Sequence, residues 1–128
     1  MTTREDVLAF LDRLDLAVEP VADDMWLVRT TEEAELVVHY APPVLLLRVR
    51  VIPLPADPAA SAALCRQLLE YNARDLVHGS YGIEGDVVVL TDALLLADLD
   101  FTEFEASVDS LALALASHLS ALAPYRER

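Results

Sequence analysis

Three kinds of side chain in this sequence could do chemistry: histidines, a cysteine and closely spaced acids. His39, His78 and His118 are scattered, and none has a second His, Cys or carboxylate at a spacing typical of metal sites. Cys65 is the sole cysteine, so no internal disulfide can form. Its neighbour Arg66 points to another side of a helix and should not activate the thiol. We therefore expect no metal site and an inert thiol.

Pairs of acidic residues could act as general acids and bases, or bind a cation. Glu103 and Glu105 are two positions apart in a predicted helix, so they point to different sides and do not share a proton. Asp98 and Asp100 precede that helix without a calcium-loop pattern around them. The chain has three glycines, and no phosphate-binding loop, dinucleotide fingerprint or nucleophile elbow. We expect a protein that is not an enzyme and that uses no cofactor.

Length and composition indicate a single globular domain over residues 1–128. The hydrophobic fraction of 55% is high, which suggests that a second subunit buries part of the apolar surface and predicts a homodimer. No apolar run approaches the roughly 18 residues of a membrane span, so we expect no membrane partner. The first residues do not resemble a signal peptide. With a single cysteine, these features predict a cytoplasmic protein.

The charge is strongly acidic, with a formal net charge of −13 and nine basic residues that are all arginine. Between Arg74 and Arg126 there are nine acids and no base. Such a field repels phosphate backbones, so direct nucleic-acid binding is disfavoured. A basic protein partner is favoured instead, and a nucleic-acid-handling protein is one natural class. The alternative is that the charge serves solubility alone.

Capping residues and apolar spacing predict the first two helices. The first helix is expected over Thr3–Leu14, with Thr2 and Glu5 forming a capping box. The second helix is expected over Pro58–Arg74, where Asp57 caps the first turn and proline fits the first helical position.

The last helix has the clearest pattern in the chain. Thr102 and Glu105 are expected to form its capping box, and Pro124 is expected to end it. Its apolar stripe recurs every three or four residues, so it should be buried against a sheet. The stripe consists of Phe104, Val108, Leu111, Leu115, Leu119 and Leu122.

Alternation and turn residues predict five strands. Two of them, Met25–Thr30 and Glu35–Tyr40, flank a short polar link, and the nearly all-apolar Val44–Ile52 should be central. A tight hairpin joins Ser80–Ile83 to Val87–Leu90 through a turn that contains glycine.

The third strand carries the candidate interaction site. A period of two puts Leu45, Leu47, Val49 and Val51 on the face that meets the helices. The other face carries Val44 and the four candidate residues for a dimer or protein-binding interface, where the arginines would meet carboxylates of a second chain. These are Leu46, Arg48, Arg50 and Ile52. The alternative is a solvated sheet face without a partner.

Three short motifs carry a resemblance to a known family. They are Leu68-Leu-Glu-Tyr-Asn72, Gly82-Ile-Glu-Gly-Asp-Val-Val-Val-Leu90 and Ala97-Asp-Leu-Asp100. With the order of the elements, they resemble the YbjN family of sensory-transduction regulators, and more loosely the type III secretion chaperone-like (CesT-like) fold. The likeness spans nearly the whole chain.

The resemblance implies an α+β fold with an antiparallel five-stranded sheet, in the order α-β-β-β-α-β-β-α. It also implies a small, acidic, often dimeric protein, and the secretion chaperones of this fold bind an extended segment of a client. The sequence therefore predicts a non-enzymatic protein-binding module, either chaperone-like or a regulatory adaptor. A dedicated type III secretion chaperone for an effector is the alternative. A small enzyme or cation-binding protein is a more distant one.

Overall fold

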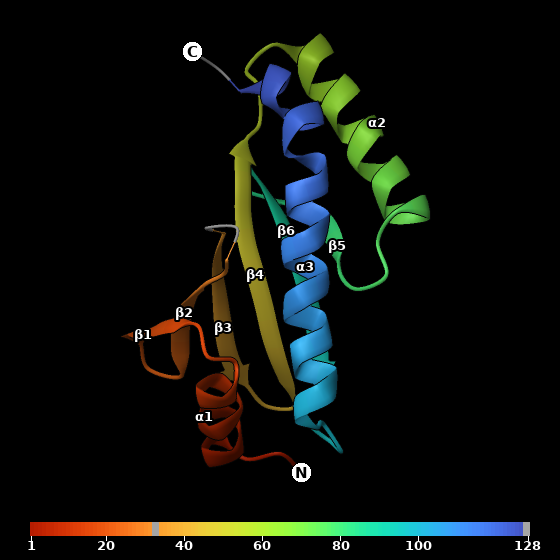
Figure 1. The fold of residues 1–128 in the computed structure, drawn as a ribbon. Coiled ribbons are helices and arrows are strands. Elements are labelled where there is room, and N and C mark those ends of the chain that lie inside the picture. Colours follow the sequence, from red (N-terminus) through yellow and green to blue (C-terminus); the bar gives the residue numbers. More distant parts are fainter. Residues whose placement is uncertain (32–33, 127–128) are drawn as a thin grey trace.

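The computed structural model describes residues 1–31 and 34–126 of the chain. Within them, three helices pack on a six-stranded sheet (Figure 1). The helices are α1 (Arg4–Arg13), α2 (Pro58–Arg74) and α3 (Phe101–Leu122), and α3 runs into a 3-10 turn, η1 (Ala123–Tyr125). The strands are β1 (Ala17–Ala22), β2 (Met25–Arg29), β3 (Glu35–Ala41), β4 (Val44–Pro53), β5 (Ser80–Glu84) and β6 (Val87–Leu95).

The sheet is antiparallel throughout, in the order β1-β2-β3-β4-β6-β5. The predicted α+β class and the central position of β4 are confirmed. The prediction of five strands was wrong by one, because β1 forms an additional edge strand against β2. Its sequence contains Pro20, which cannot donate to a ladder and disguised the strand. An edge position tolerates that proline, and a register shift follows it.

One row of aligned side chains shows which face of the sheet forms the core. The row crosses five strands and every member is buried: Tyr81, Leu90, Val49, Leu36 and Val28. All three helices pack on this face, and α3 lies along β4 and β6 (Figure 1). The core is therefore a single layer between the sheet and the helices.

The predicted apolar stripe of α3 is largely confirmed. Leu111 and Leu115 are buried, as are the flanking members of the stripe, whereas Leu119 is partly exposed. Among the described residues, one helical segment, Phe101–Tyr125, is long and apolar enough to span a membrane. The sequence did not predict such a segment, because polar residues interrupt its apolar run. The stripe packs on the sheet, so core burial accounts for part of this apolar character, whereas Leu113 and Leu119 are exposed on other sides of the helix.

The cap of α1 lies one residue later than predicted. Thr3, not Thr2, accepts the backbone N–H of Asp6, and the Asp6 carboxylate accepts the N–H of Thr3 in return. Hydrogen bonds from the Thr3 backbone N–H and the Thr3 side chain favour the charged carboxylate and lower the pKa of Asp6. The Thr2 hydroxyl instead donates to the carbonyl of Leu99 at 2.7 Å, tying the N-terminus to the loop before α3.

The cap of α3 lies two residues earlier than predicted. Asp100 and Glu103 form the capping box, with 2.8 Å from the Glu103 nitrogen to the Asp100 carboxylate. Thr102 and Glu105 satisfy the same spacing, but both already lie inside the helix. An aspartate is as good a cap as a threonine, so the spacing alone did not decide between them. The Asp57 cap of α2 is confirmed.

A register shift in β4 changes the predicted face of one candidate residue. The ladder with β6 slips between Arg50 and Ile52, which is the signature of a β-bulge. Ile52 therefore turns into the core opposite Val88 and is only 4% exposed. The assignment of Ile52 to the same face as Leu46 and Arg48 was wrong, because simple alternation cannot anticipate an inserted residue.

Candidate functional site: the open face of the sheet

The sheet has a second face that none of the described helices covers. We call it the open face and define it by the side chains that alternate with the buried row. Its members across the strands are Glu19, Met25, Leu27, Arg29, Glu35, Val37, His39, Leu46, Arg48, Arg50, Glu84, Val89 and Thr91. Most of them are partly or fully exposed. The sequence-predicted residues Leu46, Arg48 and Arg50 all lie here.

An ion pair between Arg48 and Glu84 lies near the middle of the open face. It connects β4 to β5 across β6, and the Arg48 Nη1 donates to both carboxylate oxygens of Glu84, at 2.6 Å to Oε2. Both side chains are half-exposed, so the pair contributes little to stability, about 1 kcal/mol or less. Its main effect is to fix the positions of two charges on a partly apolar surface.

Two shallow cavities flank this ion pair. One, of about 230 Å³, is mostly apolar and is lined by Met25, Val37, His39, Leu46, Leu47, Arg48, Glu84 and Thr91. The other, of about 270 Å³, is lined by Arg48, Arg50, Glu84, Val87 and Val89. Leu46 is 37% exposed beside the first cavity. Apolar hollows around fixed charges suit contact with another protein surface.

Arg50 differs from the other arginines of this face. Arg29 pairs with Glu19 and Glu35, and Arg48 pairs with Glu84, whereas Arg50 has no ion pair within residues 1–31 and 34–126. The same residues contain no cluster of His, Cys, Asp or Glu that could hold a metal ion. Among the described residues, the face thus offers an arginine without an ion pair beside apolar surface.

Sequence reasoning missed a buried polar network on the core side. The Tyr81 hydroxyl is 2.6 Å from Nδ1 of His118, and Nε2 of His118 is 3.1 Å from the Asp75 carboxylate. Tyr71 stacks on the His118 ring at 3.7 Å between centroids. Burial raises the pKa of Tyr81, so its phenol is held neutral. No local pattern signals this network, because its members come from α2, β5 and α3.

Asn72 joins two elements of the fold through its side-chain amide. The amide oxygen accepts the Tyr81 N–H at 2.7 Å, and the amide nitrogen donates to the Tyr81 carbonyl at 3.1 Å. Asn72 therefore ties α2 to the edge strand β5.

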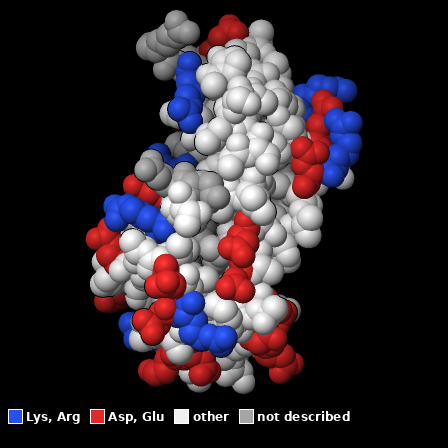
Figure 2. Space-filling view, viewed as in Figure 1, with Lys and Arg blue, Asp and Glu red and all other residues white. Residues whose placement is uncertain are grey.

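Acidic residues cover less of α3 than the sequence count suggested. They gather near its start, and the last of them is Asp109. Figure 2 shows acids toward the lower half of the molecule and a white, uncharged surface along the upper part of α3. From Ser110 to Tyr125 the chain has no charged residue except the titratable His118. The negative charge of α3 is therefore limited to its N-terminal part.

Comparison with known proteins agrees with this architecture. The family model CesT_Tir_1 matches residues 1–128, so the chain belongs to that family. No curated protein matches it in sequence.

Solved structures share the fold at low sequence identity. YbjN from E. coli, a candidate transcription regulator, has a TM-score of 0.68 at 11% identity, covering 93% of each chain. A chain of the ExoU–SpcU complex from the type III secretion system of Pseudomonas aeruginosa has a TM-score of 0.67 at 20% identity. The match covers 93% of this chain and 96% of that one.

The type III secretion chaperone SycH of Yersinia pestis, solved with a fragment of YscM2, has a TM-score of 0.64 at 16% identity. The match covers 90% of this chain and 98% of that one. The predicted likeness to YbjN and to the type III secretion chaperones is confirmed for the fold.

Proposed function

We propose that this protein is a non-enzymatic, chaperone-like module or adaptor that binds other proteins. The observation that carries the proposal is the open face, a partly apolar sheet surface left uncovered by the described helices. Membership of the CesT_Tir_1 family supports it, as does a fold shared with proteins solved in chaperone complexes. The work of such a protein is binding, so it needs neither a cofactor nor a metal.

The first occupant of the open face is a second copy of the chain. Homodimers are usually two-fold symmetric, so the same patch meets itself and each charge needs an opposite charge within the patch. The open face supplies both: Arg50 has no ion pair among the described residues, and the side chains of Glu84 and Glu35 are 58% and 64% exposed. Leu46, Arg48 and Arg50 remain the proposed interface residues. Ile52 cannot contribute, because it lies in the core.

Sedimentation equilibrium at micromolar concentration tests this interface. The wild-type chain should sediment at twice its 14.1 kDa mass, and Leu46→Asp should sediment as a monomer. Leu113→Asp is the matched control, since Leu113 is 62% exposed on the outer side of α3. It should remain dimeric. A monomeric wild type, or equal behaviour of the two variants, would reject the open-face dimer.

A dedicated type III secretion chaperone for an effector is the second candidate. Its support is the likeness to a chain of the ExoU–SpcU complex and to the chaperone SycH. The two functions differ in the partner. Affinity purification with mass spectrometry should recover a secretion substrate for a dedicated chaperone, and a resident regulator or other protein for an adaptor.

The cellular setting of the proposed function is the cytoplasm, without a membrane or a directly bound nucleic acid. The net charge of −13 favours a partner with a basic surface, for which a nucleic-acid-handling protein is one class.

A further inference from the structure

The open face carries one histidine, and this side chain lies in a cavity. His39 is on β3, between Met25 of β2 and Leu46 of β4 in the ladder. It is partly buried and lines the cavity of about 230 Å³ together with Arg48 and Glu84. Histidine is the side chain whose charge ordinarily changes between about pH 5 and about pH 8. His39 is therefore the group of this face that can respond to pH in that range.

The permanently ionised side chains of the open face balance one another. Three are arginines and three are glutamates, so their charges sum to zero in a protein whose formal net charge is −13. They are Arg29, Arg48, Arg50, Glu19, Glu35 and Glu84. Two copies of this acidic chain can therefore meet through the open face without the repulsion expected from their net charge. The balance holds as long as His39 is neutral.

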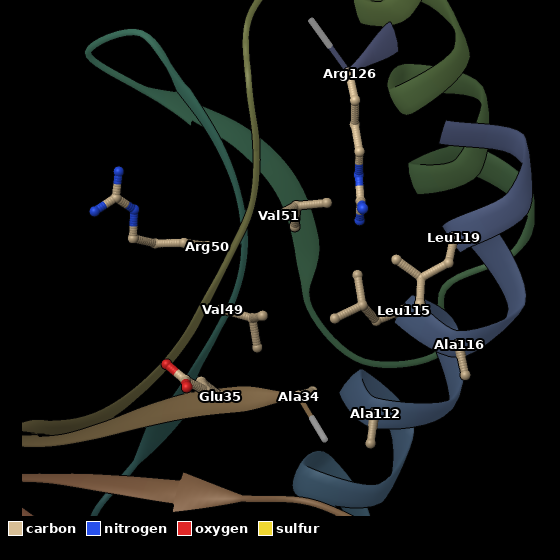
Figure 3. A pocket seen from close by; sticks show the side chains of 10 residues that line it. All are labelled: Ala34, Glu35, Val49, Arg50, Val51, Ala112, Leu115, Ala116, Leu119 and Arg126. Carbon is tan, nitrogen blue, oxygen red and sulfur yellow. The ribbon is translucent and has the colours of Figure 1, made fainter. Parts of the chain in front are cut away.

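One arginine of this set has no carboxylate partner within its own copy. In the close view of the hollow between β4 and α3, the Arg50 side chain extends away from the helix (Figure 3). Among the described residues no carboxylate forms an ion pair with Arg50. Its charge is available to a carboxylate of the second copy, and a further cation on the face would compete for that carboxylate.

A proton on His39 would add a charge that nothing in the cavity compensates. The carboxylate in the cavity lining belongs to Glu84, and both of its oxygens already accept hydrogen bonds from Arg48. The other lining residues, from β2, β3, β4 and β6, are uncharged. Glu35 is on the same strand but four residues away, which is about 13 Å along a strand and beyond the Debye length at physiological salt.

We propose that the open-face dimer is sensitive to pH and that His39 is the group that senses it, so that the dimer forms with His39 neutral and separates when His39 is protonated. The inference rests on the proposed function. Leu46 and Arg48, two of the proposed interface residues, line the same cavity, so a second copy that covers them also covers His39.

Protonation would then place an unpaired charge inside the interface on each copy, beside the Arg48 guanidinium. Loss of water around the imidazolium and the presence of like charge both oppose this. The monomer therefore binds more protons than the dimer does. By linkage, the dimer is favoured at the higher pH, and a fall in pH shifts the equilibrium toward the monomer.

Sedimentation equilibrium over a series of concentrations, at about pH 8 and about pH 5.5, tests the proposal. Aspartate and glutamate stay largely ionised at both values, so the other charges of the face do not change. The dissociation constant of the wild-type dimer should rise by about tenfold or more at the lower pH, because like charges brought together across an interface are strongly unfavourable. His39→Gln, which stays neutral, should dimerise with nearly equal affinity at both pH values. His39→Lys, which stays charged, should dimerise weakly at both.

His78→Gln is the matched control, because His78 is also partly buried but lies in the loop before β5 and does not line the cavity. This variant should keep the wild-type response to pH. Circular dichroism at both pH values checks that each variant is folded.

Two results overturn the proposal: an equal dissociation constant of the wild type at the two pH values, or a response to pH that persists in His39→Gln. The second result would assign the response to another group, such as the buried His118. In either case the open-face dimer stands if Leu46→Asp still abolishes it at the higher pH, so failure of this inference is distinguishable from failure of the proposed function. A wild type that is monomeric at both pH values overturns both.

Discussion

The Tyr81 hydroxyl and Nδ1 of His118 lie 2.6 Å apart and join the edge strand β5 to α3. Nε2 of His118 contacts the Asp75 carboxylate at 3.1 Å, and a carboxylate can only accept a hydrogen bond. Nε2 therefore carries a proton and donates it to Asp75, and Nδ1 forms the hydrogen bond with the Tyr81 hydroxyl. Both nitrogens of a buried histidine are thus satisfied, which holds the edge strand against the helical layer.

Tyr81→Phe should lower the free energy of unfolding by about 1–3 kcal/mol, because it leaves Nδ1 of His118 buried without its hydrogen-bond partner. Urea denaturation followed by circular dichroism measures the change. Tyr40→Phe is the control, since Tyr40 is a strand tyrosine that is only partly buried and no described residue binds its hydroxyl. It should change the stability by less than about 0.5 kcal/mol. Equal effects of the two substitutions would mean that the contact with His118 is not important.

The raised pKa of Tyr81 predicts how stability depends on alkaline pH. In the unfolded chain a tyrosine ionises near pH 10, while the folded state holds Tyr81 neutral at that pH. The unfolded state therefore loses the proton first, and this contribution to stability falls as the pH rises above about 10. In urea melts, the free energy of unfolding should fall more steeply with pH for the wild type than for Tyr81→Phe between about pH 9 and about pH 11. Parallel curves would contradict a buried neutral phenol.

Leu115→Ala should destabilise the fold by about 2–5 kcal/mol, since the leucine is only 7% exposed in the stripe of α3. The loss combines removed apolar contact and the remaining cavity. Leu113→Ala, two positions away on the exposed side, should cost less than about 0.5 kcal/mol in the same denaturant melts. If the order of the two variants were reversed, α3 would present its other side to the sheet.

The corrected cap of α3 makes a separate prediction. Asp100→Ala should cost about 0.5–2 kcal/mol, because the Glu103 N–H then loses its acceptor. Thr102→Ala should change the stability by less than about 0.5 kcal/mol, since Thr102 is an exposed residue within the helix. Thermal melts of both variants measure the two losses of stability. A larger loss of stability for Thr102→Ala than for Asp100→Ala would mean that Thr102 is the N-cap of α3, as the sequence predicted.

Much of the fold could be predicted because it follows from local pattern. The stripe of α3, the central strand β4 and the Asp57 cap each depend on residues close together in sequence. The errors have physical reasons. Pro20 conceals an edge strand that tolerates it, and the bulge after Arg50 reverses the alternation and buries Ile52. Neither effect can be read from a regular repeat.

The interaction surfaces could be predicted only in part. Leu46, Arg48 and Arg50 follow from alternation along one strand, so the sequence placed them on one face. The partner of Arg48 comes from the turn end of β5, and the cavity beside His39 is lined by residues of five strands. Such features depend on contacts between distant segments, and the sequence pattern contains no signal for them.

The most direct test of the central claim is to purify the protein from its native host and identify the main protein bound to it. The association rate of the two purified proteins is then measured from about 0.1 M to about 1 M salt, over which the Debye length shrinks from about 10 Å to about 3 Å. A protein-binding module with a net charge of −13 should yield a stoichiometric partner with a basic surface, whose association slows markedly at high salt. Bare DNA and RNA should not bind at physiological salt. Recovery of no stoichiometric protein, or of an acidic one that associates equally fast at both salt levels, would contradict the account.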